Sequence, residues 1–205
     1  MLALLGVTLV AGAVALLAIG GSSTSRGGSR PAVKSEFHSD GVLTPPRPAP
    51  PLTLSNYLGQ PVNIAAYRGK AVLVTFLYSH CPDVCPLIAS NLRVAQNLMG
   101  PAAAKAQIIA VSVDPRGDTP KTVAAFLATH AVTGRMQYLI GSARQLASVW
   151  SAWGVGSERD AQQPQLVNHS GLVYGITGSG NEATIYAANF RPADIAHDVP
   201  LLAAR

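Results

Sequence analysis

The sequence predicts an α/β fold in which a mixed central sheet is flanked by helices. Two observations carry this prediction. After residue 70, short apolar runs alternate with stretches of helical periodicity, a pattern typical of strands joined by crossover helices. Around residue 180, Gly178-Ser-Gly-Asn181 separates two runs of alternating apolar residues and indicates a β-hairpin. The sheet should therefore contain antiparallel as well as parallel strands.

The expected elements follow one another in a definite order along the chain. We expect strands at residues 71–78, 107–113, 136–140, 171–177 and 183–187. We expect helices at Pro86–Met99, Thr119–His130, Ala143–Trp153 and Pro192–Ala204. The third helix carries an apolar stripe that should face the core, formed by Leu146, Val149, Trp150 and Trp153. A βαβαβ half followed by a ββα half is the plan of a thioredoxin-like domain.

The first 20 residues predict a transmembrane anchor or a signal peptide. Residues 2–19 carry no charge and would extend roughly 27 Å as a helix, close to the thickness of the hydrocarbon layer of a membrane. The charge bias opposes export, because the basic residues Arg26, Arg30 and Lys34 follow the apolar stretch. Paired cysteines further along the chain favour an oxidising compartment. We therefore expect attachment to the cytoplasmic membrane, with the folded domain facing the periplasm or another extracytoplasmic space.

Residues 21–50 are rich in Gly, Ser and Pro and predict a flexible tether. This stretch leads into Thr44-Pro-Pro-Arg-Pro-Ala-Pro-Pro51, which should stiffen as polyproline II. The folded domain then occupies residues 51–205, a length that can bury a substantial core. Within residues 51–205, 11 Lys and Arg against 8 Asp and Glu give a net charge of +3, spread without an aromatic-studded basic patch, so we expect no nucleic-acid partner.

The only two cysteines of the chain lie in Ser79-His-Cys-Pro-Asp-Val-Cys-Pro86, directly after the apolar run at residues 71–77. On a helix, residues four apart lie about 5–6 Å from each other, near enough to form a disulfide or to bind one ion. Because Pro86 disfavours helical geometry at Cys85, the helix should open at Pro86. Cys81 and Cys85 then lie at a helix N-terminus, whose dipole stabilises thiolates.

Three roles for the cysteine pair stay open. A structural disulfide would add little stability, because it closes a very short loop. A redox pair, with Cys81 as the attacking thiolate, is opposed by the spacing, since thioredoxin-type oxidoreductases usually have two residues between their cysteines and this chain has three. The wider spacing favours a metal site. Two thiolates and an imidazole suit copper, as Cu(I) or Cu(II), and zinc is the second choice because structural zinc normally takes a fourth ligand.

The candidate for the imidazole is His169. It lies between an irregular stretch at residues 154–168, expected to be a mobile loop, and the strand expected at residues 171–177. Its neighbours Asn168 and Ser170 could orient its ring by hydrogen bonds. The other histidines are not expected to be ligands: His80 should point away from Cys81, and solvated positions are expected for His38, His130 and His197.

Other polar and aromatic residues near these motifs have expected roles of their own. Asp114 and Asp118 are expected to be structural, with Asp118 capping the following helix. Asp83, between the cysteines, is expected near the site, where it could tune the thiolates or contact a partner. Tyr78 and Tyr174 are expected either to shield the site from water or to fill the core.

Three motifs carry a resemblance to a known family: His80-Cys-Pro-Asp-Val-Cys-Pro86, Ser112-Val-Asp-Pro-Arg-Gly-Asp-Thr-Pro120, and Val167-Asn-His-Ser170. Together they resemble the SCO/SenC proteins, membrane-tethered copper chaperones with a thioredoxin-like fold. The resemblance implies the copper ligands Cys81, Cys85 and His169. It also implies a partner, the copper-bearing subunit of cytochrome c oxidase or another copper protein. The protein would be a metallochaperone rather than an enzyme, and the alternative is a thiol-disulfide oxidoreductase that reduces the cysteines of the oxidase copper site.

One position departs from the family pattern. The family usually has Asp before the ligand histidine, and this chain has Asn168. The exchange removes a negative charge next to the site and should make the histidine less basic. We expect it to lower the affinity for Cu(II) more than the affinity for Cu(I).

Overall fold

The computed structural model describes residues 36–159, 161–163 and 166–205. The anchor or signal peptide expected at residues 1–20 and the first part of the expected tether lie outside these residues. In the part of the chain that is described, no helix combines the length and apolar character needed to cross a membrane.

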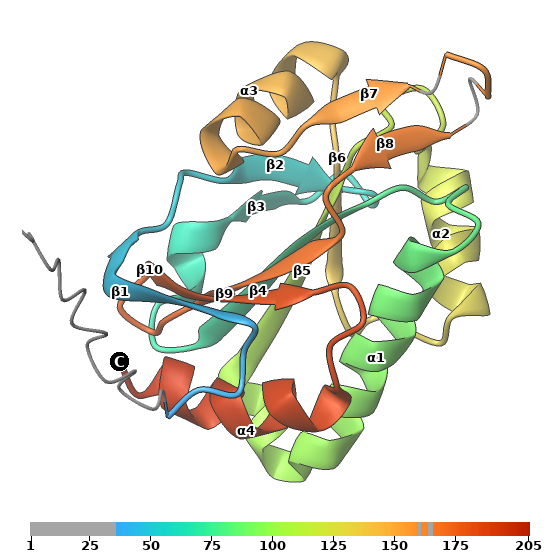
Figure 1. Ribbon diagram of the computed structural model, residues 1–205. Helices are drawn as coiled ribbons and strands as arrows, with labels where there is room; N and C mark the ends of the chain where they lie inside the picture. The colour runs from blue at the N-terminus through green and yellow to red at the C-terminus, as the bar shows by residue number, and fades with distance from the viewer. Residues whose placement is uncertain (1–35, 160, 164–165) are drawn as a thin grey trace, which may run out of the picture. The chain divides into compact units, whose positions relative to one another are not determined.

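Within the described ranges, eight strands form one mixed sheet in the order β1-β10-β9-β4-β5-β6-β2-β3 (Figure 1). β4, β5 and β6 run parallel to one another, and the remaining neighbours are antiparallel. The strands are β1 (Gly41–Pro48), β2 (Thr53–Asn56), β3 (Pro61–Asn63), β4 (Ala71–Leu77), β5 (Ala106–Ser112), β6 (Gln137–Ile140), β9 (Leu172–Ile176) and β10 (Asn181–Ala187). A separate antiparallel ribbon pairs β7 (Ser157–Arg159) with β8 (Val167–His169).

Helices cover both faces of the sheet. They are α1 (Val84–Met99), α2 (Pro120–Thr129), α3 (Ala143–Trp153) and α4 (Pro192–Ala203), with 3-10 turns at Ile64–Tyr67 and Gly100–Lys105. Tyr174 of β9 contacts Trp153 of α3, whereas its neighbour Gly175 approaches Leu202 of α4. Because successive residues of a strand point to opposite faces, α3 and α4 lie on opposite sides of the sheet (Figure 1).

The core lies around β4, the strand that leads to the cysteines. All seven residues of β4 are buried, as the uninterrupted apolar run predicts for a strand covered on both faces. Burying a large apolar side chain contributes about 1.5–3 kcal/mol to the free energy of unfolding. β4 is therefore strongly held, and it fixes the start of the turn that follows it. In α3, the expected stripe is buried at Leu146, Val149 and Trp153, and Trp150 instead donates its Nε1–H to the Ser112 carbonyl at 2.9 Å.

The mixed sheet flanked by helices is confirmed, and so is the hairpin at Gly178–Asn181, which joins β9 to β10. Three differences stand out. β2 and β3 were not expected. The stretch at residues 154–168, expected to be a loop, contributes β7 and most of β8. A third difference concerns the expected tether.

The prediction of a flexible tether is wrong for Gly41–Pro48, which form the edge strand β1 beside β10. The register joins Gly41 to Ile185 and Pro48 to Asn181 and is interrupted between Val42 and Arg47. Pro45 and Pro46 fall in that interruption, where a missing backbone N–H removes no ladder hydrogen bond. A proline-rich segment can therefore be extended and paired at a sheet edge, which composition alone does not distinguish from polyproline II.

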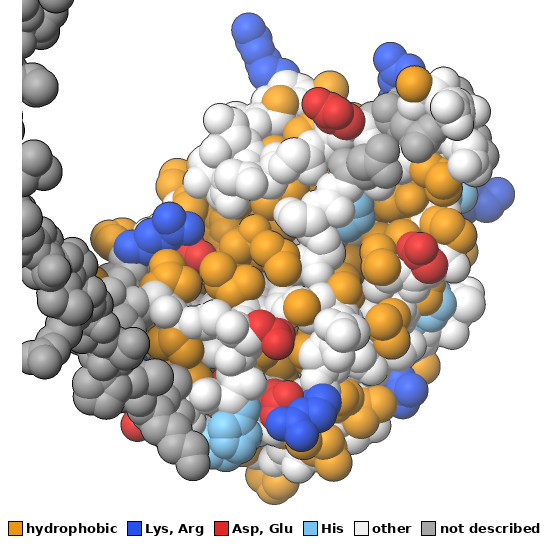
Figure 2. All heavy atoms as spheres, in the orientation of Figure 1, with side chains coloured by type: hydrophobic (Ala, Val, Ile, Leu, Met, Phe, Trp, Pro, Cys, Tyr) orange, Lys and Arg blue, Asp and Glu red, His pale blue; other side chains and the backbone are white. Residues whose placement is uncertain are grey.

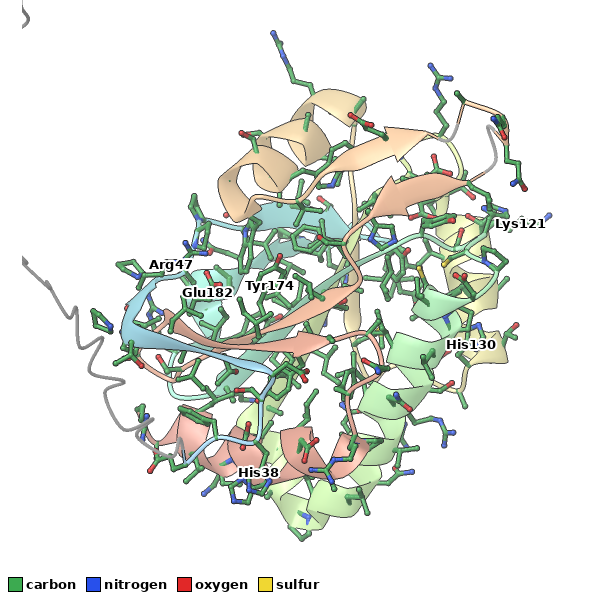
Figure 3. The ribbon with its side chains drawn as sticks, in the orientation of Figure 1. His38, Arg47, Lys121, His130, Tyr174 and Glu182 are labelled. Carbon is green, nitrogen blue, oxygen red and sulfur yellow. The ribbon has the colours of Figure 1, made fainter. Side chains whose placement is uncertain are left out.

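β1 is also held by an ion pair with a buried partner. On the face shown in Figure 2, charged side chains are scattered among apolar and neutral ones. Most of them are solvated, but the carboxylate of Glu182 on β10 is only 1% exposed. It accepts hydrogen bonds from Arg47 Nε at 3.0 Å and from Arg47 Nη2 at 3.2 Å (Figure 3). The guanidinium therefore neutralises a charge that burial would otherwise make costly.

Replacing Arg47 with Met should lower the free energy of unfolding by about 1–3 kcal/mol, because Glu182 is then left buried without its cation. Urea denaturation of the two proteins measures this change. The matched control is Arg144→Met on the exposed side of α3, which should stay within about 0.5 kcal/mol of the original. Equal stability of the two variants would show that Glu182 does not need Arg47.

Candidate metal centre

The cysteines lie where β4 passes into α1. β4 ends at Leu77, and residues 78–83 form the turn. Asp83 is the N-cap of α1 and accepts a hydrogen bond from the backbone N–H of Val84. Cys81 lies in the turn and is 7% exposed, whereas Cys85 lies in the first turn of the helix and is completely buried. The backbone N–H of Cys85 donates to Cys81 Sγ at 3.3 Å, so the helix start holds the sulfur of the turn in place.

The helix begins at Val84, two residues before the expected start at Pro86. The first N–H groups of a helix have no partner within it, so a proline at the third position loses no hydrogen bond. The cap at Asp83 provides the start instead. As a consequence, Cys85 belongs to the helix and faces the core rather than preceding the helix.

His169 reaches the same place on the β7–β8 ribbon, where it pairs with Ser157. Its Nδ1–H donates to the carbonyl oxygen of Ser170 at 3.2 Å, and its Nε2 lies 3.8 Å from Cys85 Sγ. Because a carbonyl can only accept, Nδ1 carries a proton in this arrangement, and Nε2 is the ring atom that faces the sulfur. The side chain of Asn168 lies outside the described structure, so its expected orienting role is not tested.

Tyr78 fixes the position of the ribbon. Its ring meets the ring of His169 edge to face, with centroids 5.8 Å apart and planes at 81°. The Tyr78 hydroxyl oxygen accepts a hydrogen bond from the backbone N–H of Val167 at 3.4 Å. Tyr78 therefore links the turn that carries Cys81 to the strand that carries His169.

Cys81 and His169 line one cavity of about 220 Å³, and Cys85 lies buried next to them. The cavity is lined by Tyr78, Cys81, Pro82, Asp83, Val84, Leu166, Val167 and His169. Among the described residues, the group whose ligand atoms all lie within 4.8 Å of one another is a different one, His38, His197 and Asp198. The ligand atoms of Cys81, Cys85 and His169 therefore do not all lie within that distance, although His169 Nε2 is 3.8 Å from Cys85 Sγ. Two sulfurs and one imidazole nitrogen are the ligand types that fit a soft ion.

The two thiols have opposite electrostatic environments. Hydrogen bonding from the Cys85 thiol is the largest cause that lowers the pKa of Cys81, to about 4; the His169 imidazole and the backbone N–H groups of Asp83 and Cys85 add to it and outweigh burial. Burial is the main cause that raises the pKa of Cys85, and the neighbouring Cys81 adds to it. Burial also raises the pKa of Tyr78 to about 12. The pair therefore consists of one thiolate facing the cavity and one thiol behind it.

Asp118 is structural, but it does not cap the next helix as expected. Its buried carboxylate accepts hydrogen bonds from Ser79 N–H at 2.8 Å, from Ser112 Oγ at 2.6 Å and from Tyr138 Oη at 3.0 Å. Thr119 is the cap of α2. Three donors in a buried position offset the desolvation of the carboxylate, which a single exposed cap bond would not require. Asp118 thereby ties the turn after β4 and the end of β5 to the hydroxyl of Tyr138 on β6.

The structure also places the other residues for which the sequence predicted a role. Asp114 is buried and accepts a hydrogen bond from the backbone N–H of Arg116, so it holds its loop as expected. Asp83 caps α1, and its Oδ1 lies 3.7 Å from Cys81 Sγ. His80 is exposed beside Ser79, and Tyr174 packs in the core rather than at the cavity. The lining by Leu166 and Val167 was missed, because no periodicity in residues 154–168 indicated a ribbon.

The comparison with known proteins now decides the family. The model of the SCO1/SenC family matches residues 44–204. The chain belongs to the SCO1/SenC family. Among curated relatives, it is 32% identical over 121 residues to the mitochondrial SCO2 homolog of Bos taurus, covering 57% of this chain and 45% of that protein. It is 31% identical over 126 residues to SenC of Rhodobacter capsulatus, covering 60% and 56%. The chain spans about half the length of these relatives.

Solved structures of SCO1/SenC proteins share the fold. The structure of Bradyrhizobium japonicum ScoI with copper bound is 29% identical, with a TM-score of 0.60 and coverage of 74% of this chain and 97% of that one. The solution structure of apo Sco1 from Thermus thermophilus is 25% identical, with a TM-score of 0.67 and coverage of 82% and 97%. The predicted thioredoxin-like arrangement agrees with these relatives.

Titration of the reduced, metal-free protein should reveal one thiolate that forms with a pKa near 4, far below the ordinary value of about 8.5. The ultraviolet absorbance of the thiolate measures it. Because the folded-state pKa is depressed, the contribution of Cys81 to stability is fully present above the unfolded-state pKa and is lost as the pH falls through about 4. The low-pH step should vanish in Cys81→Ser and move to higher pH in Cys85→Ser, which lacks the main donor. If both thiols ionised with pKa values near the ordinary one of about 8.5, the predicted difference between Cys81 and Cys85 would be wrong.

Proposed function

We propose that this protein is a copper metallochaperone that binds copper through Cys81, Cys85 and His169 and helps to assemble the copper centre of cytochrome c oxidase. The observation that carries the proposal is the 3.8 Å approach of His169 Nε2 to Cys85 Sγ beside the cavity that Cys81 lines. The copper-bound ScoI relative supports the choice of ion. The protein would be held at the cytoplasmic membrane by residues 1–20, with its domain on the extracytoplasmic side.

The three side chains suit copper for chemical reasons. Thiolate sulfur is the preferred donor for Cu(I), which accepts low coordination numbers, and imidazole also serves Cu(II). The low pKa of Cys81 makes it a thiolate before the ion arrives, and Nε2 is the atom of His169 nearest to Cys85 Sγ. Cys85 must lose its proton when the ion arrives, so binding releases that proton to solvent. Copper is the cargo of this site rather than a permanent part of the fold.

Delivery would proceed by ligand exchange at the open side of the cavity. Cys81 is the more accessible sulfur, and Cys85 is completely buried beneath it. A thiolate of the client would therefore first replace Cys81 on the ion and afterwards displace the deeper ligands. The client would be the copper-bearing subunit of the oxidase or another copper protein, and the oxidation state of the ion would not change.

The polarised thiol pair favours a second candidate function, thiol-disulfide exchange. The Cys81 thiolate would attack a disulfide of the oxidase copper site and form a mixed disulfide. Cys85 would then lose its proton, attack Cys81 and release the client as a dithiol. Two electrons pass to the client, and an external dithiol must afterwards reduce the Cys81–Cys85 disulfide. The reaction does not need His169 as a ligand.

Copper titration of His169→Ala separates the two functions. Mutation of a residue that merely hydrogen-bonds to a metal ligand typically lowers metal affinity by about 10–100-fold. Loss of the ligand itself should therefore weaken Cu(I) binding by more than about 100-fold. Competition with a chromophoric Cu(I) chelator measures this change. Dithiol exchange by the same variant should persist, because both sulfurs remain.

The matched control is His80→Ala, which removes an exposed imidazole next to Cys81 but outside the cavity lining. It should bind copper like the original protein. Unchanged affinity in His169→Ala would remove the histidine from the site and leave thiol exchange as the function.

Asn168→Asp restores the charge that the family usually has before the histidine. The added carboxylate should make the imidazole more basic and stabilise the more highly charged ion. We expect the affinity for Cu(II) to rise by about 10-fold or more and the affinity for Cu(I) to rise less. Parallel titrations with both oxidation states measure the difference, and an equal gain for both ions would contradict the electrostatic explanation.

A further inference from the structure

A second group of metal-binding side chains lies where the segment before β1 crosses α4. His38 comes from that segment, and His197 and Asp198 come from α4. One ligand atom from each of the three residues lies within 4.8 Å of the other two. The imidazole rings of His38 and His197 stack with centroids 3.7 Å apart and planes at 4°. In Figure 3, His38 lies at the opposite end of the domain from the β7–β8 ribbon. None of the three residues lines the cavity beside Cys81, so the two groups are separate.

The carboxylate of Asp198 is the buried base of this group. It is fully buried and accepts hydrogen bonds from the backbone N–H of His38 at 2.9 and 3.0 Å and from Tyr186 Oη at 2.8 Å. His197 Nδ1 lies 2.8 Å from Asp198 Oδ1 and can donate to it. His197 Nδ1 and Asp198 Oδ1 can instead face one ion when the ring carries its proton on Nε2.

A second carboxylate contributes less to the group. Asp194 Oδ1 lies 3.7 Å from His38 Nδ1, but the same carboxylate is already paired with the Arg191 guanidinium at 2.7 and 2.9 Å. Arg191 therefore neutralises Asp194. Asp198, in contrast, has only hydrogen-bond donors that carry no fixed charge, so its negative charge is available to a cation.

Both imidazoles can reach an ion from solvent. The side chain of His38 is 50% exposed and that of His197 is 43% exposed. On the face shown in Figure 2, histidine side chains reach the surface near α4 beside acidic and basic side chains. Parallel stacked rings do not direct both nitrogens at one point, so one ring must turn about its Cβ–Cγ bond to share an ion. The exposure of both rings permits this turn.

We propose that His38, His197 and Asp198 form a second metal site, which binds a divalent transition-metal ion such as Zn²⁺, Ni²⁺ or Cu²⁺. Two imidazoles and a carboxylate suit ions of borderline softness, whereas the sulfur-rich cysteine site suits Cu(I). The site joins residues that are 159 and 160 positions apart in sequence, because His38 precedes the first strand and His197 and Asp198 lie in the last helix. An ion bound there would fasten the N-terminal segment to α4.

The segment before β1 is packed against α4 by protein contacts of its own. Phe37 is buried, the Arg205 guanidinium lies 4.7 Å from the centre of its ring, and Arg205 also pairs with Glu36. Asp40 accepts a hydrogen bond from the backbone N–H of Ala187 at 2.8 Å. These contacts place His38 beside His197 before metal arrives, so little ordering is needed for binding, which favours affinity.

Equilibrium dialysis with Zn²⁺ tests the site in the full chain carrying Cys81→Ser and Cys85→Ser, which removes the thiol site from the measurement. Zn²⁺ is redox-inert and has no strong geometric preference. We expect one ion per chain, and an affinity lowered at least about 10-fold by His38→Gln and by His197→Gln. His130→Gln is the matched control; His130 packs on Phe126 at the end of α2 and should not change binding.

A second measurement uses the unaltered cysteines, so the test does not depend on the folding of the serine variants. Zn²⁺ should slow amide hydrogen exchange at residues 36–40, and His197→Gln should abolish this effect although it changes another element of the chain. Absence of Zn²⁺ binding to the serine variant, binding that either histidine variant leaves intact, or unchanged exchange at residues 36–40 would each overturn the second site. None of these outcomes bears on copper binding at Cys81, Cys85 and His169, so the two proposals fail separately.

Discussion

The chemistry of the cysteine site depends on the complete burial of Cys85 in the first turn of α1. Burial raises the pKa of that thiol, so it keeps its proton and can donate to Cys81. The same hydrogen bond is the largest cause of the low pKa of Cys81. The site thus holds one negative charge at its mouth instead of two. A second thiolate appears only when a cation enters to compensate for it, which couples deprotonation of Cys85 to metal binding.

The position of Cys85 is itself fixed by polar contacts below the site. Asp118 joins the turn after β4, the end of β5 and the hydroxyl of Tyr138 on β6. Burial raises the pKa of this carboxyl, and three hydrogen bonds oppose that change by stabilising the charged form. The turn after β4, the end of β5 and β6 are therefore joined through one buried carboxylate, which supports the cysteine turn. On the other side of the cavity, Tyr78 connects this support to the ribbon that carries His169.

The sequence was most informative where a residue pattern has one physical solution. The apolar run of β4, the helical stripe of α3 and the hairpin between β9 and β10 were predictable because each pattern fits only one kind of element. The start of α1 was misplaced because Pro86 was read without its cap, Asp83. β1 was missed because pairing depends on a distant edge, where Arg47 meets Glu182. Likewise, Cys81 and Cys85 follow from local spacing, but the approach of His169 depends on a ribbon that local periodicity does not encode.

The two sets of metal ligands differ in softness, the property of ligand atoms that most strongly decides which metal ion a protein site prefers. Cys81, which lines a cavity of about 220 Å³, and the buried Cys85 provide sulfur, which favours a soft ion with few ligands. His38, His197 and Asp198 provide nitrogen and oxygen at a half-exposed surface, which favours a borderline divalent ion with water in its remaining positions. The two sets share no residue and rank ions differently, because sulfur ligands select Cu(I) most strongly, whereas nitrogen and oxygen ligands do not. A divalent ion bound by His38, His197 and Asp198 would then leave the cysteine cavity free for the copper ion that the protein carries.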